Sequence, residues 1–421
     1  MKNIFLFIFF VLFSFPLFAQ ENWTIQSIQF EGLEKTKPHY LLQFLKSKEG
    51  EIFQTKNLEN DIQQLWNVGT NQSVNAKVDS LPGQEVILTF QLKEKKTLLP
   101  IINFGGVEEN IWYQLGFIDF NFSGRGHQFL AFYQNTDNRH GGQLYYRMPY
   151  INKKWGLAWN LLQFRSEEPL FFQEGTVFYN YDNLLGEITF IRNFGFRKRV
   201  ELSTGLFQEK YQKNGNQILA DPPGPSELTV LKTTTKLEYI DNRLDFYDFY
   251  IHGWSWRGIS QTVFNLEDDS HFLSLILQAR RFHRVGEKGN LAARFRFGLS
   301  SNNDSPFAPF VVDSRVNLRG SGNRIERGTG QIILNLEYRH TLLNLNNWAI
   351  QGVVFSDLGN WRTPGGSLSE FFDKDELRQF VGGGFRLIFK PVFGAILRVD
   401  YGIDIYETSR RGIVLGVGQY F

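Results

Sequence analysis

The sequence predicts a mostly β protein, in which a transmembrane antiparallel β-barrel of about 16 strands follows one small α+β domain. Three observations support this fold class. Apolar and polar residues alternate over most of the chain, aromatic residues make up 16% of its 421 residues, and 39 residues are glycine. Beyond the first 20 positions there is no run of apolar residues long enough for a transmembrane helix. Alternating strands can cross a membrane without such a run, because a tilted strand needs only about ten residues.

The first 20 residues have the features of a secretory signal. Lys2 supplies a positive charge, residues 4–18 form an apolar core, and Ala19 is a small residue suited to cleavage. The alternative is an N-terminal membrane anchor, but the apolar segment is short and no basic flank follows it. We therefore expect residues 1–20 to be a signal peptide and the rest of the chain to be exported.

Several classes of function are disfavoured by the composition. The chain has no cysteine, so thiolate metal sites, a cysteine nucleophile and disulfides are excluded. A net charge of +2 gives no reason to propose nucleic acid as a partner. The seven histidines are not spaced as metal ligands, and no Gly-x-Ser-x-Gly motif is present. We expect no enzymatic activity, metal or cofactor; a hydrolase built from scattered Asp and His residues is the alternative.

Residues 21–96 differ from the rest of the chain because they contain the helical periodicity. A strand-like run ends at Gly32, Pro38 begins one helix-like segment, and Leu58, Ile62 and Leu65 share one face of a second. Two alternating segments then close the region. This order predicts a β-α-α-β-β domain.

Residues 97–421 alternate with a period of two. For example, Leu291, Phe295 and Leu299 share one face, whereas Arg294 and Arg296 lie on the other. A soluble β-sandwich would also alternate, with its polar face in water. The strand length, the charged inner face and the export signal favour a barrel, because lipid offers the backbone no hydrogen-bond partners and the sheet must close. Three long polar connections would be surface loops: residues 208–227, 264–271 and 363–376.

Residues 316–330 are the most informative segment. They read VNLRGSGNRIERGTG, with three arginines and four glycines. Such a connection usually lies in water, but the strands after it place Glu337, Phe355 and Asp357 on the luminal face. Arg319, from a loop folded into the barrel, could stack on Phe355 and pair with Asp357, and Glu337 is a further possible partner. A buried arginine without such partners would be costly.

These motifs resemble those of the outer-membrane assembly and translocation superfamily that includes BamA, TamA and the two-partner-secretion transporters. Leu318-Arg319-Gly320-Ser321 resembles the Val-Arg-Gly-Tyr/Phe signature of its sixth extracellular loop, and Phe355-x-Asp357-x-Gly359 resembles its second signature. Residues 21–96 resemble one POTRA domain. Further segments that resemble the family are Trp112–Gly124, Asp241-Asn242-Arg243-x-Asp245 and Gly416-x-Gly418-Gln419-x-Phe421.

Two departures from the family pattern are visible. Ser321 stands where the signature has an aromatic residue, so one packing contact of the loop would be missing. A single POTRA domain, where BamA has several, argues against a central assembly role, because these domains recruit accessory partners.

The resemblance implies a bacterial outer-membrane protein with its POTRA domain in the periplasm, which assists insertion or translocation of proteins. The POTRA domain would bind client polypeptides or other envelope proteins by β-augmentation. The client would then use the seam between the first strand, near residues 98–105, and the last, residues 413–421. Gly416, Gly418 and Phe421 would form a terminal-strand signal there, with barrel curvature as the alternative explanation of the glycines. A non-catalytic channel or a structural subunit of a larger outer-membrane complex is the alternative function.

Overall fold

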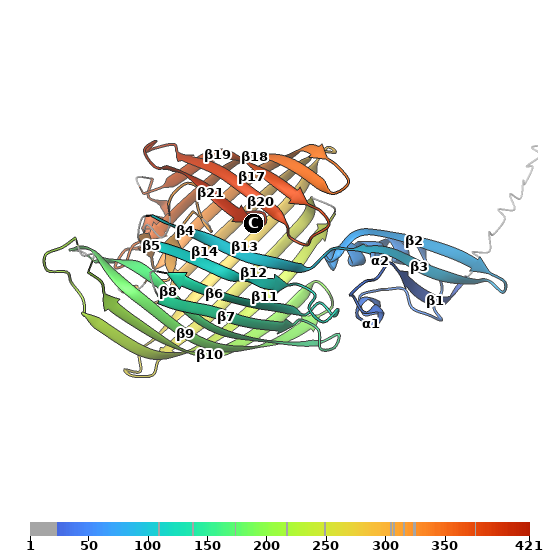
Figure 1. Ribbon diagram of the computed structural model, residues 1–421, viewed down its shortest axis with the longest axis horizontal. Helices are drawn as coiled ribbons and strands as arrows, with labels where there is room; N and C mark the ends of the chain where they lie inside the picture. Colours follow the sequence, from blue (N-terminus) through green and yellow to red (C-terminus); the bar gives the residue numbers. More distant parts are fainter. Residues whose placement is uncertain are drawn as a thin grey trace, which may run out of the picture.

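The structure is a computed structural model that describes residues 23–421, except 108–109, 137–138, 173, 216–217, 248–249, 304, 306–307, 315, 323–325 and 375. The expected signal peptide, residues 1–20, lies outside the described residues. A small N-terminal domain is followed by one large, strongly curved sheet, and Figure 1 shows the domain at one end of the strands. None of the helices in the described residues is long and apolar enough to cross a membrane.

The N-terminal domain confirms the predicted order of elements. Its three strands hydrogen-bond in the order β1-β3-β2, with β1 parallel and β2 antiparallel to β3. Its elements are β1 (Thr24–Glu31), α1 (Pro38–Leu42), α2 (Thr55–Asn67), β2 (Asn71–Leu81) and β3 (Glu85–Glu94).

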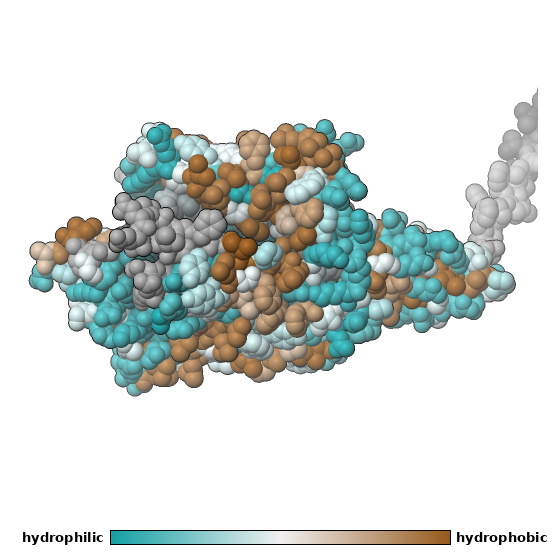
Figure 2. Space-filling view, in the orientation of Figure 1, coloured by the Kyte–Doolittle hydropathy of each residue, from teal (hydrophilic) through white to brown (hydrophobic). Residues whose placement is uncertain are grey.

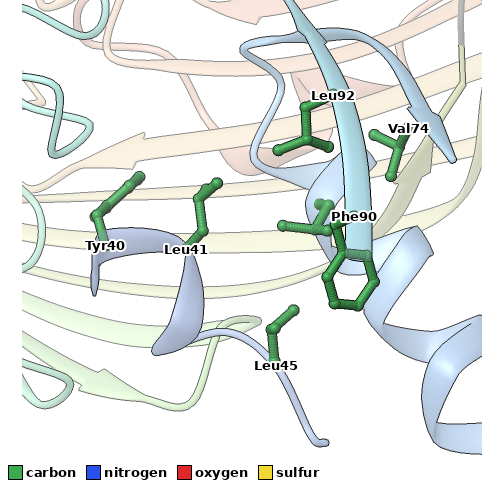
Figure 3. Close-up of a cluster of buried hydrophobic side chains, with 7 residues drawn as sticks. Tyr40, Leu41, Leu45, Val74, Phe90 and Leu92 are labelled. Carbon is green, nitrogen blue, oxygen red and sulfur yellow. The ribbon is translucent and has the colours of Figure 1, made fainter. Parts of the chain in front are cut away.

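Apolar side chains from the two helices and two of the strands form the core of this domain. Leu41, Leu65 and Phe90 are completely buried. Figure 3 shows that Leu41 comes from α1 and Phe90 from β3. Burying each such side chain contributes about 1.5–3 kcal/mol, so hydrophobic burial accounts for the stability of the domain.

The large sheet has sixteen antiparallel strands in the part of the chain that the structure describes, which confirms the predicted number. Its strands follow one another in space as in sequence, apart from a two-stranded hairpin between β14 and β17. The sixteen strands are β4 (Leu98–Val107), β5 (Asn110–Asp119), β6 (Gln128–Thr136), β7 (Arg139–Met148), β8 (Trp155–Phe172), β9 (Gly175–Phe194), β10 (Lys198–Lys213), β11 (Glu227–Phe246), β12 (Ile251–Asn265), β13 (His271–Val285), β14 (Gly289–Ser300), β17 (Gly330–Asn344), β18 (Trp348–Arg362), β19 (Arg378–Phe389), β20 (Ile396–Asp404) and β21 (Arg411–Val417).

The two faces of the sheet differ as the alternation predicts. In β10, Leu202 and Leu206 are about half exposed on the outer face, whereas Glu201 and Ser203 are buried on the inner face. Figure 2 shows apolar side chains gathered over the middle of the strands and hydrophilic ones beside the N-terminal domain. The sheet is therefore apolar outside and polar inside, the reverse of a water-soluble sandwich.

The prediction of a loop at residues 208–227 is wrong for residues 208–213. Strand β10 continues to Lys213, so the connection covers only residues 214–226. Glu209 and Tyr211 lie on the luminal face, where Glu209 pairs with Lys232 of β11 at 2.5 Å. A polar segment can thus remain a strand, because the inner face of this sheet accepts charge. The longest strands reach 20 residues, about twice the predicted length.

The N-terminal domain is hydrogen-bonded to the end of the sheet. At the end of α2, the Asn67 amide donates to Asp245 at 3.0 Å and accepts the backbone N–H of Phe246 at 3.0 Å. After β1, Thr36 accepts a hydrogen bond from Asn121 at 2.9 Å. These contacts hold the domain against the turns at one end of the barrel.

The chain just before the first strand of the large sheet contacts a turn near its last strands, beside the N-terminal domain. Lys96, just before β4, donates its N–H to Pro391 and accepts the N–H of Phe393, both at 2.8 Å. Residues 391 and 393 belong to the turn between β19 and β20. The turn next to the last strands is therefore tied to the chain just before the first strand.

Candidate functional site

The segment between β14 and β17 folds into the barrel. It contains the hairpin β15 (Phe310–Val312) and β16 (Glu326–Gly328), and the described residues between these strands include Leu318 and Arg319, which are both completely inaccessible to solvent. Leu318 packs with Phe310 and with inward-facing side chains of the barrel wall. Arg324 lies outside the described residues. The buried position of Arg319 requires partners for its charge.

Asp357 of β18 binds Arg319 in a bidentate manner. The arginine Nε donates to one carboxylate oxygen at 2.9 Å and Nη2 donates to the other at 3.0 Å. The backbone N–H of Arg319 also donates to Asp357 at 3.0 Å, and the Asn335 amide donates to it at 2.8 Å. Asp357 thus fixes both the side chain and the backbone of the loop at this residue.

Two aromatic rings contact the same guanidinium. The central carbon of the Arg319 guanidinium lies 3.6 Å from the ring centre of Phe355 and 4.3 Å from that of Tyr420. A cation over an aromatic face gains electrostatic attraction, and more so when both groups are shielded from water. The structure therefore brings Arg319, Phe355 and Asp357 together, and Tyr420 joins them.

The remaining donors of Arg319 reach a second buried carboxylate. Its Nη1 donates to Glu337 of β17, which also accepts hydrogen bonds from Arg339 at 2.5 Å and Arg386 at 3.3 Å. Arg386 in turn donates to Asp400 of β20 at 2.7 Å. Each of these charges has a partner of opposite sign, which is what a buried ionic network needs in order to be stable.

The backbone of the loop turn lies directly against β20. Gly320 has a φ of +96°, and a Cβ atom there would lie 2.5 Å from the carbonyl oxygen of Gly402. A Cβ atom on Gly402 would lie 2.1 Å from the carbonyl oxygen of Arg319. Glycine is therefore needed on both sides of this contact.

The C-terminus of the chain also turns into the barrel. Strand β21 ends at Val417, Gly418 has a φ of +88°, and Tyr420 is buried with its hydroxyl donating to the carbonyl of Ser314 at 3.0 Å. Arg339 donates to the backbone carbonyl of Phe421 at 3.1 Å. The expectation that the last strand runs to Phe421 is therefore wrong, because Gly418 turns the chain inward, where the final aromatic residues meet the arginines.

The remaining residues that the sequence predicted for the site lie at the edge of this network or outside it. Gly359 lies under the loop, where a Cβ atom would be 3.2 Å from Leu318. Gly416, in β21, leaves space for the Arg398 guanidinium, which would be 2.5 Å from a Cβ atom. Ser321 contacts Ser314 with 3.4 Å between their hydroxyl oxygens, in place of an aromatic contact.

A second ion pair attaches the loop to the opposite wall. Arg327, in β16, donates to Glu168 of β8, and the Glu168 side chain is almost completely buried. The Nη1 nitrogen of Arg327 donates to the carbonyl of Ala308 at 3.3 Å. The loop therefore crosses the lumen from β18 to β8. Arg327 also lines a luminal cavity of about 740 Å³ between the loop and strands β8–β13.

Several members of this site were not identified from the sequence as partners of the loop. They are Asn335, Arg339, Arg386, Asp400 and Tyr420. The alternation already places Asn335 and Arg339 on the same luminal face as Glu337, so it marks them as candidates. Nothing in the sequence shows that Asp400 and Tyr420 reach the loop, since that depends on the curvature of the sheet. No group of residues in the described part of the chain could hold a metal ion.

Comparisons with known proteins agree with this architecture. The POTRA family model, described as a surface antigen variable number repeat, matches residues 23–95, and the model of the Omp85 superfamily domain matches residues 121–421. No curated protein matches the sequence.

Three solved structures show the same fold at low sequence identity. BamA from Haemophilus ducreyi lacking POTRA domains 1–3 is 14% identical with a TM-score of 0.55, and the match covers 93% of this chain and 83% of that one. CdiB from Acinetobacter baumannii is 13% identical with a TM-score of 0.56, covering 91% and 71%. CdiB from Escherichia coli is 10% identical with a TM-score of 0.59, covering 93% and 75%.

The family matches confirm the resemblance that the motifs predicted. Together with the similar solved structures, they indicate an outer-membrane β-barrel that carries one POTRA domain. The family model of the barrel alone covers more than half of the sequence. The chain therefore belongs to the Omp85 superfamily.

Proposed function

We propose that this protein assists the insertion or translocation of proteins at the bacterial outer membrane, with its POTRA domain in the periplasm. Membership of the Omp85 superfamily supports a role of this general kind. The observation that carries the proposal is the last strand, β21, which ends at Val417 while residues 418–421 turn into the lumen. The strand beside the seam therefore has only 7 residues, whereas β4 on the other side of the seam has 10.

The POTRA domain offers one strand edge for a client. Its sheet has the order β1-β3-β2, so β1 and β2 are the outer strands. The outer edge of β1 is partly occupied, because Ile25 exchanges backbone hydrogen bonds with residues 50 and 51. We therefore assign client binding to β2, where an extended polypeptide could add a fourth strand by backbone hydrogen bonds.

The seam between β4 and β21 is where the client would continue into the barrel. These strands are the two ends of the hydrogen-bonded strand order. A client strand could pair with one edge there, whereas every other strand of this sixteen-stranded sheet already has a partner on both sides. The residues that anchor the loop would act as positioning residues for this step, because the loop binds the C-terminus next to the seam. They are Arg319, Gly320, Glu337, Phe355, Asp357 and Gly359.

Disulfide crosslinking tests the seam directly, because the chain has no native cysteine. One cysteine would be placed in β4 and one in β21, and outer-membrane protein content would be measured in cells that depend on the variant. We expect oxidation to reduce that content and reduction to restore it. A control pair at Tyr401 and Ile413, which are aligned partners in β20 and β21, should have no effect. Unchanged content after efficient seam crosslinking would refute the proposal.

A passive channel or a structural subunit is the second candidate function. It is supported by a polar luminal cavity of about 480 Å³, lined by charged residues that include Arg147, Arg257 and Glu201. If the protein instead assists insertion or translocation, ion conductance in planar bilayers should be low, because the loop that crosses the lumen would obstruct a wide channel. High conductance, or a stable stoichiometric complex whose loss leaves outer-membrane protein content unchanged, would favour this function instead.

A further inference from the structure

A second site lies at the junction of the POTRA domain and the barrel. A cavity of about 450 Å³ opens between the end of α1 and the turns that join β7 to β8 and β9 to β10. It belongs to neither the loop site nor the seam. Its lining consists of Gln43, Phe44, Tyr150, Lys153, Lys154, Arg192, Asn193, Phe194, Gly195 and Phe196.

The lining carries three positive charges and no carboxylate. In the part of the chain that the structure describes, Lys153, Lys154 and Arg192 form no ion pair with an acidic residue. Neighbouring cations do have acidic partners, since Arg197 pairs with Asp245 at 2.8 Å and Arg199 with Glu201 at 2.6 Å. The cavity lining therefore carries three cations that these neighbouring carboxylates do not neutralise, and an anion would complement them.

The backbone that carries these cations is held in place. Asn152 accepts hydrogen bonds from the N–H groups of Lys154 at 2.9 Å and Trp155 at 3.0 Å. The carbonyl of Lys154 accepts the N–H of Asn193 at 2.7 Å, and the Asn193 amide donates to Pro149 at 2.9 Å. The two turns are thus bound to each other, which fixes the backbone that carries these cations.

Arg192 lies on the outer, lipid-facing side of the barrel. It is the aligned partner of Trp155, and its guanidinium carbon lies 4.5 Å from the ring centre of Trp155 and 5.7 Å from that of Phe194. Both rings are more than half exposed. Aromatic residues of this kind mark the level of the lipid headgroups in membrane barrels. The cation is therefore held where headgroup phosphates are found.

The POTRA domain supplies the other wall of the cavity. Phe44, just after α1, makes edge contacts with Tyr150 and Phe196, with ring centres 5.1 and 5.0 Å apart. Gln43 beside it adds an amide that can donate a hydrogen bond into the cavity. A ligand bound here would touch both the domain and the barrel.

We infer that this cavity binds the phosphodiester headgroup of an anionic phospholipid. Three cations attract its negatively charged phosphate, and the exposed rings of Trp155 and Phe194 offer apolar surface beside them for the lipid. A zwitterionic headgroup fits less well, because its own ammonium would meet three positive side chains. The bound lipid would hold the POTRA domain in its docked orientation beside the membrane, in the periplasmic leaflet if the proposed orientation is right.

Native mass spectrometry of the purified protein in detergent tests this inference. The protein would be titrated separately with dioleoyl phosphatidylglycerol, dioleoyl phosphatidylcholine and inorganic phosphate. We expect phosphatidylglycerol to bind more tightly than the other two. The variant K153Q/K154Q/R192Q should lose at least about tenfold in affinity for it, since each cation near an anionic surface contributes about fivefold.

A matched variant removes the same number of positive charges elsewhere at the same end of the barrel. R281Q/R284Q/K288Q alters two residues near the end of β13 and one in the turn to β14, which also contains Glu287, and should bind phosphatidylglycerol as the wild type does. The charge-conserving variant K153R/K154R/R192K should retain binding, and heat-modifiable gel mobility would show that each barrel is folded.

Three results would overturn the inference. They are equal binding of the two lipids, equal losses in the two glutamine variants, and displacement of phosphatidylglycerol by inorganic phosphate at similar concentrations. The last result would mean that the cavity binds a free anion. The measurement needs no client protein, so its outcome is independent of the proposed function.

Discussion

The POTRA domain and the interior of the barrel are stabilised by different means. In the POTRA domain, the fully buried side chains include the apolar Leu41, Leu65 and Phe90, which form one cluster. Inside the barrel, the side chains buried to the same degree include Arg319 and Asp357. The POTRA core depends mainly on the removal of apolar surface from water, whereas the loop inside the barrel depends on hydrogen-bonded ion pairs as well.

This difference has an energetic consequence. An apolar core loses the transfer free energy of the removed atoms plus a cavity term, and the cavity term shrinks where neighbouring side chains partly fill the space. A buried ionic network tolerates the loss of one member poorly, because the remaining partner keeps its charge without compensation. The comparison therefore predicts a large, non-additive response in the barrel and a moderate, local response in the POTRA domain.

The largest effect is expected at the ion pair between Arg319 and Asp357. Asp357→Ala should destabilise the barrel by about 3–5 kcal/mol, because a fully buried guanidinium loses its bidentate partner. Arg319→Ala should give the same phenotype, and the double variant should be no worse than either single one. Heat-modifiable gel mobility and protease resistance of the loop measure these effects, with export unaffected. Wild-type values for both properties in either single variant would contradict the proposed anchoring role.

A smaller and strictly local effect is expected in the POTRA core. Leu65→Ala should destabilise this domain by about 3 kcal/mol through loss of buried methyl groups and formation of a cavity. Hydrogen exchange of residues 23–95 should accelerate, while the barrel retains its heat-modifiable mobility. Leu42→Ala is the control, since Leu42 is 41% exposed and should change little. A loss of barrel mobility in Leu65→Ala would show that the two regions are not independent.

The C-terminal contact provides a third and weaker test. Tyr420→Phe keeps the ring beside Arg319 but loses the hydrogen bond to Ser314, which is expected to cost about 1 kcal/mol. Tyr420→Ala should cost more, because the aromatic contact is lost as well. Thermal shift of the gel mobility measures both, and Tyr401→Phe on the exposed outer face is the control. Equal values for Tyr420→Phe, Tyr420→Ala and the wild type would mean that the C-terminus does not hold the loop.

The smallest effect is expected for an ion pair in solvent. Arg410 and Glu407 are 3.1 Å apart and both are about half exposed. Arg410→Ala should change stability by less than about 1 kcal/mol, because water solvates each charge and side-chain ordering offsets the attraction. The same gel assay compares it with Arg319→Ala. A similar loss in both variants would show that burial is not what distinguishes the network inside the barrel.

The sequence predicted most of the fold because its signals are local. Alternation assigns Arg294 and Arg296 to the inner face and Leu291 to the outer face without knowledge of any distant residue. In the same way, helical spacing places Leu58, Ile62 and Leu65 on one face of α2. The prediction was wrong at residues 208–213, because a polar composition was taken as a sign of a loop although the strand has a polar face.

The candidate site was predictable in part for the same reason. Phe355 and Asp357 are two residues apart in one strand, so period two places them on one wall beside Glu337 of the neighbouring strand. Asp400 and Tyr420 were not predicted as partners, since they are 81 and 101 positions from Arg319 in the chain. Their approach depends on how far the sheet curves and on the turn at Gly418.

The sequence by itself determined the strand periodicity, the number of strands, the α+β order of the first domain and the family to which the chain belongs. All of these follow from the spacing of residue types along short segments. Only the tertiary structure decided that the C-terminus leaves the last strand, that Tyr420 lies on Arg319, and that three cations line a cavity at the POTRA junction. Such contacts join residues far apart in the chain, and they arise only when the curved sheet brings its walls, its loop and the first domain together.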